Sequence, residues 1–250
     1  MALRLIDNSV FLHIPKTGGS FICQYLRNQH LIKENCAGQH DDLFRCLYPQ
    51  DWPTRASRVI KEFIPKLKGR LHIKKEQHDW KKGPQPHQPN SESLPYMFCF
   101  VRNPISWVES YYHYCVKQEW YYWSSEYDYG GFWHPNAVLN TLKSNSLNQF
   151  VEKLLLKRPG YVTEMYGWYT TPGIRFIGKT ESLRDDLAKV LRLRNLSFDT
   201  GELKTATKVN VSQSCSTDNN WDENLLKEFV LSEYSCFKRF GYKIPFNINI

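Results

Sequence analysis

The sequence predicts an α/β domain in which a central parallel sheet is flanked by helices in a three-layer arrangement. Three short apolar runs, at residues 10–14, 97–101 and 174–177, have the length and composition of buried strands. Each run is followed within a few residues by turn-forming residues and then by apolar residues at helical spacing. Strands that alternate with helices in this way are typical of α/β folds with parallel strands.

Capping residues indicate where the predicted helices begin. After the first run, two glycines precede a helix with one apolar face. After the second run, Asn103 is a favourable N-cap residue and Pro104 suits the first helical position. After the third run, Thr180 or Ser182 is expected to cap a helix with an apolar stripe. A further amphipathic helix is predicted over residues 222–237.

The whole chain has the length of one domain, and we expect a single domain over residues 1–250. It contains no run of roughly 18 apolar residues, the length that a membrane helix needs. The N-terminal segment, residues 1–7, is too short for a signal peptide and reaches an acidic residue, Asp7, too early, so a cytoplasmic protein is expected. The 7 cysteines form no C-x-x-C pair, which favours reduced thiols and no metal site.

Charge adds a weaker signal. The chain has 33 Lys and Arg against 25 Asp and Glu, a net charge of +8. A basic surplus of this size favours an anionic partner such as a nucleotide, a nucleic acid or an acidic glycan. A solvated basic surface without a partner explains the surplus equally well.

The loop after the first run, residues 13–20, has the composition of an anion-binding site. Two glycines allow a tight turn that exposes backbone N–H groups, and the following helix adds a partial positive charge at its start. The side-chain donors are Lys16, Thr17 and Ser20. A glycine turn with an incidental lysine is the alternative interpretation. In the P-loop of kinases the lysine follows the glycines, whereas Lys16 precedes Gly18 and Gly19, and this order argues against magnesium–ATP chemistry.

A second anion site is predicted after the second run. Arg102 stands at the expected end of a strand, and Ser110 lies about two turns into the helix that begins at Pro104. The planar guanidinium group suits a phosphate dianion, and a serine hydroxyl can donate to the same group. An Arg-x-Pro step alone is a common structural feature. The two motifs in this order imply a ligand with two separate phosphate-like ends.

Residues 11–20, FLHIPKTGGS, closely resemble the 5'-phosphosulfate-binding loop of sulfotransferases that use 3'-phosphoadenosine 5'-phosphosulfate (PAPS). The resemblance is to the branch of heparan sulfate 2-O-sulfotransferase and related carbohydrate sulfotransferases. Arg102, Pro104 and Ser110 resemble the family's 3'-phosphate motif, in which a serine stands eight positions after the arginine. Patchier similarity continues at residues 176–187, 209–212 and 240–242. The cofactor-binding residues that the resemblance implies are Pro15, Lys16, Thr17, Gly18, Gly19, Ser20, Arg102 and Ser110.

The resemblance also implies a P-loop-like sulfotransferase fold and a mechanism. The sulfuryl group of PAPS would pass to an acceptor hydroxyl by in-line displacement without a metal, and 3'-phosphoadenosine 5'-phosphate would be the product. Lys16 would stabilise the charge on the leaving phosphate oxygen. A histidine would accept the proton of the acceptor. His72 is the preferred base because related enzymes have one in this interval, and His78 is the alternative.

The expected partners are the nucleotide cosubstrate and a carbohydrate acceptor rather than a nucleic acid. Residues 111–133 are rich in aromatic side chains, of which 111–115 are expected in the core and 120–133 are a candidate wall of the acceptor site. Glu181 is either a carboxylate favoured at a helix start or a ligand-binding residue. Two other functions remain: a basic nucleic-acid- or glycan-binding module without catalysis, and a P-loop kinase. The sequence leaves the acceptor and the oligomeric state open.

Overall fold

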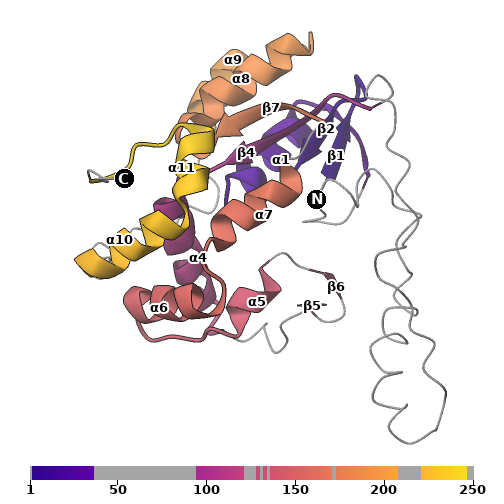
Figure 1. Cartoon of the computed structure of the whole chain (residues 1–250). Coiled ribbons are helices and arrows are strands. Elements are labelled where there is room, and N and C mark those ends of the chain that lie inside the picture. Colours follow the sequence, from indigo (N-terminus) through magenta and orange to yellow (C-terminus); the bar gives the residue numbers. More distant parts are fainter. Residues whose placement is uncertain are drawn as a thin grey trace, which may run out of the picture. The chain divides into compact units, whose positions relative to one another are not determined.

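The computed structural model describes residues 2–36, 94–120, 128–129, 132–133, 136–170, 173–207 and 221–246 (Figure 1). The chain divides into two units, residues 1–46 with 95–250 and residues 47–94. Every described residue except Leu94 belongs to the first unit. The single domain expected over residues 1–250 stays a prediction.

The first unit is built on a five-stranded sheet with the strand order β3-β1-β2-β4-β7 (Figure 1). The strands are β1 (Ala2–Leu5), β2 (Val10–Leu12), β3 (Ile32–Asn35), β4 (Met97–Val101) and β7 (Ile174–Lys179). The three predicted apolar runs are β2, β4 and β7, and these strands are parallel to one another. The prediction of an α/β fold is therefore confirmed. β2 and β4 are buried as expected, but the prediction of a buried strand is wrong for β7, which lies at the edge of the sheet with Arg175 and Ile177 exposed.

The sheet is mixed, however, and the prediction of a wholly parallel sheet is wrong. β1 is antiparallel to β2, and β3 is antiparallel to β1. Only residues 6–9 separate β1 from β2, and a parallel connection needs a dozen residues or more. This short turn is stabilised by Asp7, whose Oδ1 accepts hydrogen bonds from the backbone N and the hydroxyl of Ser9 at 3.0 and 2.6 Å. A separate two-stranded sheet pairs β5 (Asp128–Tyr129) with β6 (Phe132–Trp133).

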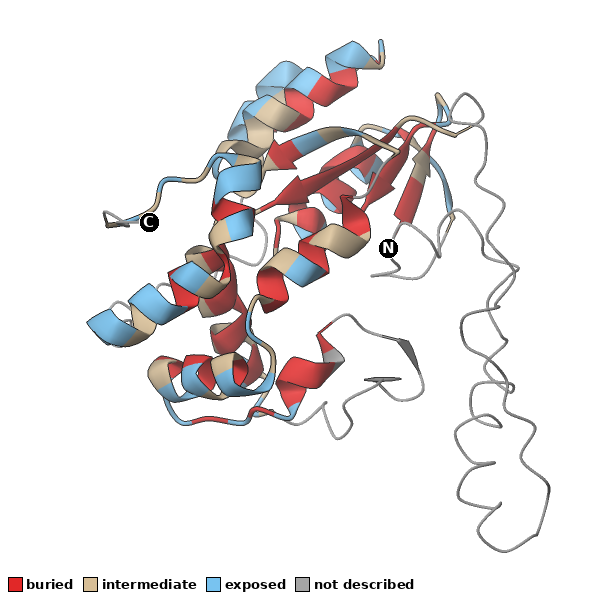
Figure 2. Ribbon diagram, viewed as in Figure 1, coloured by how far each residue is buried: buried red, intermediate tan, exposed pale blue. Residues whose placement is uncertain are grey.

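Helices cover both faces of the sheet. All five residues of β4 are buried, although they alternate between the two faces, so neither face is open at this strand (Figure 2). The helices are α1 (Gly19–Asn28), α4 (Pro104–Lys117), α5 (Ala137–Asn140), α6 (Leu147–Lys157), α7 (Tyr161–Tyr169), α8 (Leu183–Leu193), α9 (Thr200–Thr205), α10 (Glu223–Ser232) and α11 (Tyr234–Phe240). A 3-10 turn, η3 (Thr180–Ser182), precedes α8.

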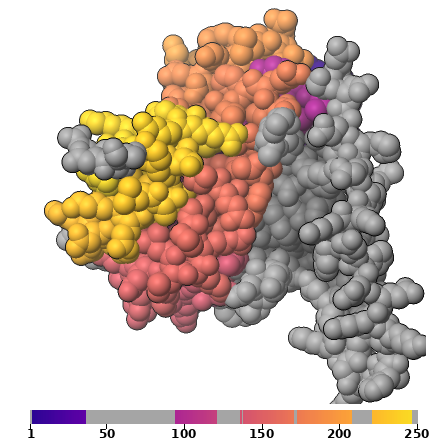
Figure 3. All heavy atoms as spheres, in the orientation of Figure 1, coloured from indigo at the N-terminus to yellow at the C-terminus, as the bar shows by residue number. Residues whose placement is uncertain are grey.

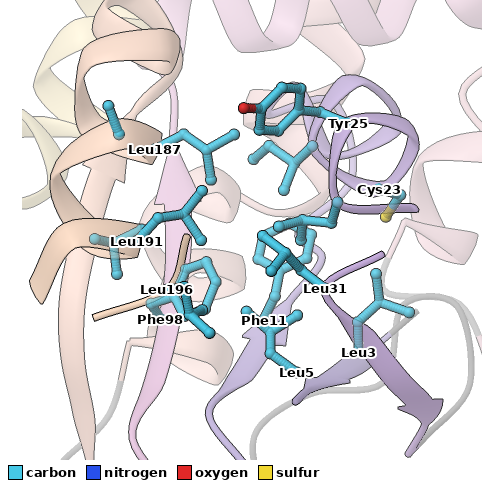
Figure 4. Packing of buried hydrophobic residues seen from close by; sticks show 14 of the residues in the cluster. Leu3, Leu5, Phe11, Cys23, Tyr25, Leu31, Phe98, Leu187, Leu191 and Leu196 are labelled. Atoms are coloured by element: carbon cyan, nitrogen blue, oxygen red, sulfur yellow. The ribbon is translucent and has the colours of Figure 1, made fainter. Parts of the chain in front are cut away.

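One core cluster joins the sheet to α1 and α8 (Figure 4). Phe11 of β2 and Phe98 of β4 lie next to each other, with ring centres 5.4 Å apart. Leu187 and Leu191 of α8 pack in the same cluster and contribute to the apolar stripe predicted for this helix. The sheet and these two helices are thus held together mainly by burial of apolar side chains.

The predicted helix starts are confirmed at α4 and revised at α8. Asn103 caps α4, since its side-chain Oδ1 accepts a hydrogen bond from the N of Ile105 at 2.9 Å, and Pro104 is the first helical residue. Ser182 occupies the N-cap position of α8 but makes no side-chain capping bond there. Its hydroxyl donates instead to Asp186 Oδ2 at 2.7 Å. The hydroxyl of Thr180 donates to a carbonyl of β4.

The single helix predicted over residues 222–237 is wrong, because the structure has α10 and α11 with a break at Glu233. The Glu233 carboxylate is buried and accepts three hydrogen bonds at 2.6–2.8 Å from the N of Val162 and from the N and hydroxyl of Thr163. Burial raises the pKa of this carboxyl, although the three hydrogen bonds oppose the shift. Glu233 thus caps the start of α7. In Figure 3 the yellow α10 and α11 lie against the segment of α6 and α7, which they contact.

Candidate anion-binding site

The two predicted anion motifs lie at the same edge of the sheet. Residues 13–18 follow β2, Arg102 follows β4, and η3 follows β7. Because these three strands are parallel and adjacent, their carboxyl ends lie side by side (Figure 1). In open α/β sheets, ligands bind at this edge.

The glycine loop is a tight turn that packs directly on the sheet. Gly18 has φ 83°, a left-handed conformation that favours glycine. A Cβ at Gly19 would lie 1.9 Å from Cδ2 of His13. The start of α1 is therefore so close to this imidazole that only glycine fits. The buried hydroxyl of Thr17 donates to the carbonyl of Ile14 at 2.9 Å. His13 is itself buried and belongs to this packing.

Lys16 projects from this loop with its backbone also in the left-handed region, at φ 65°. Its Nζ lies 4.6 Å from the centre of the Tyr114 ring, a cation–π contact. Burial and the nearby positive charge of Arg102 lower the pKa of Lys16 from its ordinary value of 10.5 to about 8. The ammonium group is therefore short of solvation, and an anion placed beside it would restore favourable interactions.

One face of α4 lies against the glycine loop. Trp107 donates from Nε1 to the carbonyl of Pro15 at 2.9 Å, and Tyr114 lies beneath Lys16. Ser110 stands three residues after Trp107 and four before Tyr114, so it shares this side of the helix. Ser110 is buried. The serine of the second motif thus belongs to the helix face that contacts the first motif.

Arg102 brings the two motifs into contact. Its Nη1 lies 3.4 Å from the carbonyl oxygen of Lys16, a long hydrogen bond. Burial lowers the pKa of Arg102, although nearby tyrosine and carboxylate groups oppose the shift. Arg102 and Lys16 therefore form a pair of partly desolvated cations at one edge of the sheet. Such a pair favours a multiply charged anion.

Glu181 serves the start of α4 in this structure. Its Oε1 accepts a hydrogen bond from the N of Asn103 at 2.8 Å, and its Oε2 accepts one from the hydroxyl of Tyr242 at 3.2 Å. The carboxylate thus stands at a helix start, as one of the two interpretations of the sequence expected. The helix is α4, however, and not α8, whose first residues follow Glu181 in the chain.

Several predicted site residues lie outside the described residues. These are both candidate bases, His72 and His78, the segment 209–212, and most of the candidate acceptor wall. From that wall, Trp120 is described, and its ring lies 5.9 Å from that of Phe150. Tyr111, in the half expected in the core, is fully buried, with its hydroxyl 2.6 Å from Oδ1 of Asn140.

Within the part of the chain that the structure describes, His, Cys, Asp and Glu side chains form no group of three that could hold a metal ion. None of the described helices is both long enough and apolar enough to span a bilayer. No protein-family model and no curated protein matches the chain. A functional assignment therefore rests on the two motifs and on the contacts that join them.

The lowered pKa of Lys16 leads to a prediction about stability. Between pH 8 and pH 10.5 the unfolded chain binds more protons at this residue than the folded chain does, so folding stability rises with pH across this window. In Lys16→Met this contribution is absent. We expect the stability of the wild type, relative to Lys16→Met, to increase by about 2 kcal/mol between pH 7 and pH 9.5.

Urea unfolding of both proteins at the two pH values measures this change. Lys227→Met is the control for replacing a lysine by methionine, because Lys227 is exposed on α10 and does not contribute to the pKa shift of Lys16. If the free energy of unfolding of the wild type differs from that of Lys16→Met by the same amount at pH 7 and at pH 9.5, Lys16 is not desolvated in the folded chain.

Proposed function

We propose that the chain is a sulfotransferase that transfers the sulfuryl group of PAPS to an acceptor hydroxyl, most simply one on a carbohydrate. The observation that carries this proposal is the contact between Arg102 Nη1 and the Lys16 carbonyl at 3.4 Å. It brings the glycine loop and the arginine motif together at the carboxyl edge of β2 and β4. A nucleotide with a 5'-phosphosulfate and a 3'-phosphate has two anionic ends, one for each motif.

Each motif has a separate task in this proposal. The N–H groups at the start of α1, together with Lys16, Ser20 and the backbone N–H of Thr17, bind the 5'-phosphosulfate. The Thr17 hydroxyl, expected from the sequence as a donor to this group, donates to the Ile14 carbonyl instead. Arg102 and Ser110 bind the 3'-phosphate, and the guanidinium supplies two parallel donors. Both cations are partly buried, so their interaction with a phosphate group is stronger than it would be in water.

The chemical step is a displacement at sulfur. The acceptor oxygen forms a bond to the sulfur atom while the bond from sulfur to the bridging phosphate oxygen breaks. The acceptor proton passes to the base, for which His72 is proposed and His78 is the alternative. Lys16 stabilises the negative charge that develops on the leaving phosphate oxygen. Positioning and charge stabilisation supply the rate enhancement, as in phosphoryl transfer.

Ligand-induced stabilisation tests the assignment. We expect 3'-phosphoadenosine 5'-phosphate at about one hundred times its Kd to raise Tm by about 5 °C or more, and adenosine monophosphate to have a smaller effect at the same concentration. Transfer of radiolabelled sulfate from PAPS to a panel of carbohydrate, phenol and amine acceptors then identifies the acceptor class.

Two outcomes would contradict the proposal in different ways. Stabilisation by ATP that requires magnesium, without stabilisation by 3'-phosphoadenosine 5'-phosphate, would favour a kinase. Affinity for DNA or RNA that falls steeply with salt, without nucleotide binding, would favour a binding module.

A further inference from the structure

The backbone on both sides of Arg102 is held by side chains from distant parts of the chain. β4 ends at Val101, and past this point the peptide groups leave the regular hydrogen bonding of the sheet. The N–H of Arg102 donates to the hydroxyl of Tyr166 at 3.0 Å, and the same hydroxyl donates to the carbonyl of Arg102 at 2.9 Å. A tyrosine hydroxyl has one donor and two acceptor sites, so it can make both bonds at once.

The two neighbouring backbone atoms are bonded as well. The hydroxyl of Thr180 donates to the carbonyl of Val101 at 3.0 Å, and the N–H of Asn103 donates to the Glu181 carboxylate at 2.8 Å. All four polar atoms of the two peptide groups that flank Arg102 are thus bonded to side chains of α7 or η3. We call Tyr166, Thr180 and Glu181 the Arg102 cradle.

Two members of the cradle, Tyr166 and Glu181, are themselves held by further contacts. Tyr166 is fully buried, and its ring meets that of Phe240 edge to face at 5.7 Å. Glu181 also accepts a hydrogen bond from the Tyr242 hydroxyl. Two fixed peptide planes determine the direction of the Cα–Cβ bond between them, and hence the space that the Arg102 guanidinium can reach. An arginine held in this way loses less conformational freedom when it binds a ligand.

We infer that Tyr166 is a positioning residue that selects nucleotides with a 3'-phosphate by holding the backbone of Arg102. This inference rests on the proposed function, because it takes Arg102 as the ligand of the 3'-phosphate. Tyr166 itself does not touch the nucleotide in this account. Its effect therefore falls on the end of the ligand that Arg102 binds and leaves the 5' end unaffected.

Calorimetric titration of Tyr166→Phe tests the inference, with 3'-phosphoadenosine 5'-phosphate and adenosine monophosphate as the two ligands. We expect the affinity for the first to fall about tenfold and the affinity for the second to change by less than about twofold. Tyr161→Phe is the matched control. Tyr161 is a fully buried tyrosine of the same helix, and its hydroxyl donates to Asn136 Oδ1 at 2.9 Å, away from Arg102. Loss of the Tyr161 hydroxyl should leave the ratio of the two nucleotide affinities unchanged.

A second pair of variants covers the case in which Tyr166→Phe does not fold. Thr180→Val removes the hydroxyl that binds the Val101 carbonyl, and Thr180→Ser keeps it. We expect Thr180→Val to lose part of the preference for the 3'-phosphate and Thr180→Ser to retain it. If Tyr166→Phe, or in its place Thr180→Val, keeps the wild-type ratio of affinities, the inference is wrong while the proposed function stands. A wild type that binds both nucleotides equally well would instead contradict the proposed function.

Discussion

Replacement of Lys16 by alanine is expected to lower kcat for sulfuryl transfer by about 10²- to 10³-fold or more, with the fold intact. In the proposed mechanism the ammonium group stabilises charge that appears only as the bond from sulfur to the phosphate oxygen breaks, so its loss would raise the barrier to the chemical step. Alanine and lysine both carry a Cβ, so the left-handed backbone at φ 65° is no more strained in the variant. Because the cation is partly desolvated in the folded chain, we expect the loss of its charge to cost little folding stability at pH 7.

Single-turnover transfer of radiolabelled sulfate, together with Tm, measures this effect. Lys117→Ala is the matched control, because Lys117 is a nearby but exposed lysine on α4. It should turn over at a rate close to that of the wild type. Turnover by Lys16→Ala at the wild-type rate would refute the role of Lys16. If Lys16→Ala loses its cooperative unfolding transition, Lys16→Met takes its place in the assay, because methionine keeps most of the length of the lysine side chain.

The Arg102→Ala variant is expected to bind 3'-phosphoadenosine 5'-phosphate about 10- to 100-fold more weakly, while its affinity for adenosine monophosphate changes by less than about threefold. Hydrogen bonds between a guanidinium group and a phosphate dianion are charge-assisted and among the stronger polar contacts in proteins. Burial lowers the pKa of Arg102, so a bound dianion also restores lost solvation. Adenosine monophosphate has no 3'-phosphate and does not use this contact.

Titration of both nucleotides into wild type, Arg102→Ala and Arg158→Ala distinguishes the two ends of the ligand. Arg158 is the control because its guanidinium already binds the Glu164 carboxylate at 2.6 and 2.9 Å. Its removal should leave both affinities unchanged. An equal loss of affinity for both nucleotides in Arg102→Ala would remove this residue from the 3'-phosphate site.

The parallel part of the sheet could be predicted because β2 and β4 are continuous apolar runs and β7 carries three apolar residues within four positions, which local composition identifies. The cap at Asn103 could be predicted for a similar reason, since the capping bond joins residues only two positions apart. β1 and β3 were not identified. β3 lies at the end of the sheet and is largely exposed, so it lacks the apolar run that indicates a buried strand.

The break at Glu233 was not predicted from the local sequence, and the residues that the Glu233 carboxylate binds lie in another helix. Residues 222–237 keep a helical apolar pattern through the break, and Phe229 and Phe237 are both buried on either side of it. α10 ends at Ser232, and the side chain of the next residue, Glu233, binds the start of α7, about seventy residues earlier in the chain. Tyr166 was missed because no local pattern relates it to Arg102.

The amino-acid sequence alone determined which segments become the parallel strands and where the glycine loop and the arginine motif stand along the chain, because these features depend on residues that are close in sequence. Only the tertiary structure decided that Lys16 and Arg102 meet at one edge of the sheet, and that Tyr166, Thr180 and Glu181 hold the backbone of the arginine. The physical reason is that these contacts join residues far apart in the chain. Their geometry depends on how the sheet and helices pack, which no local pattern encodes.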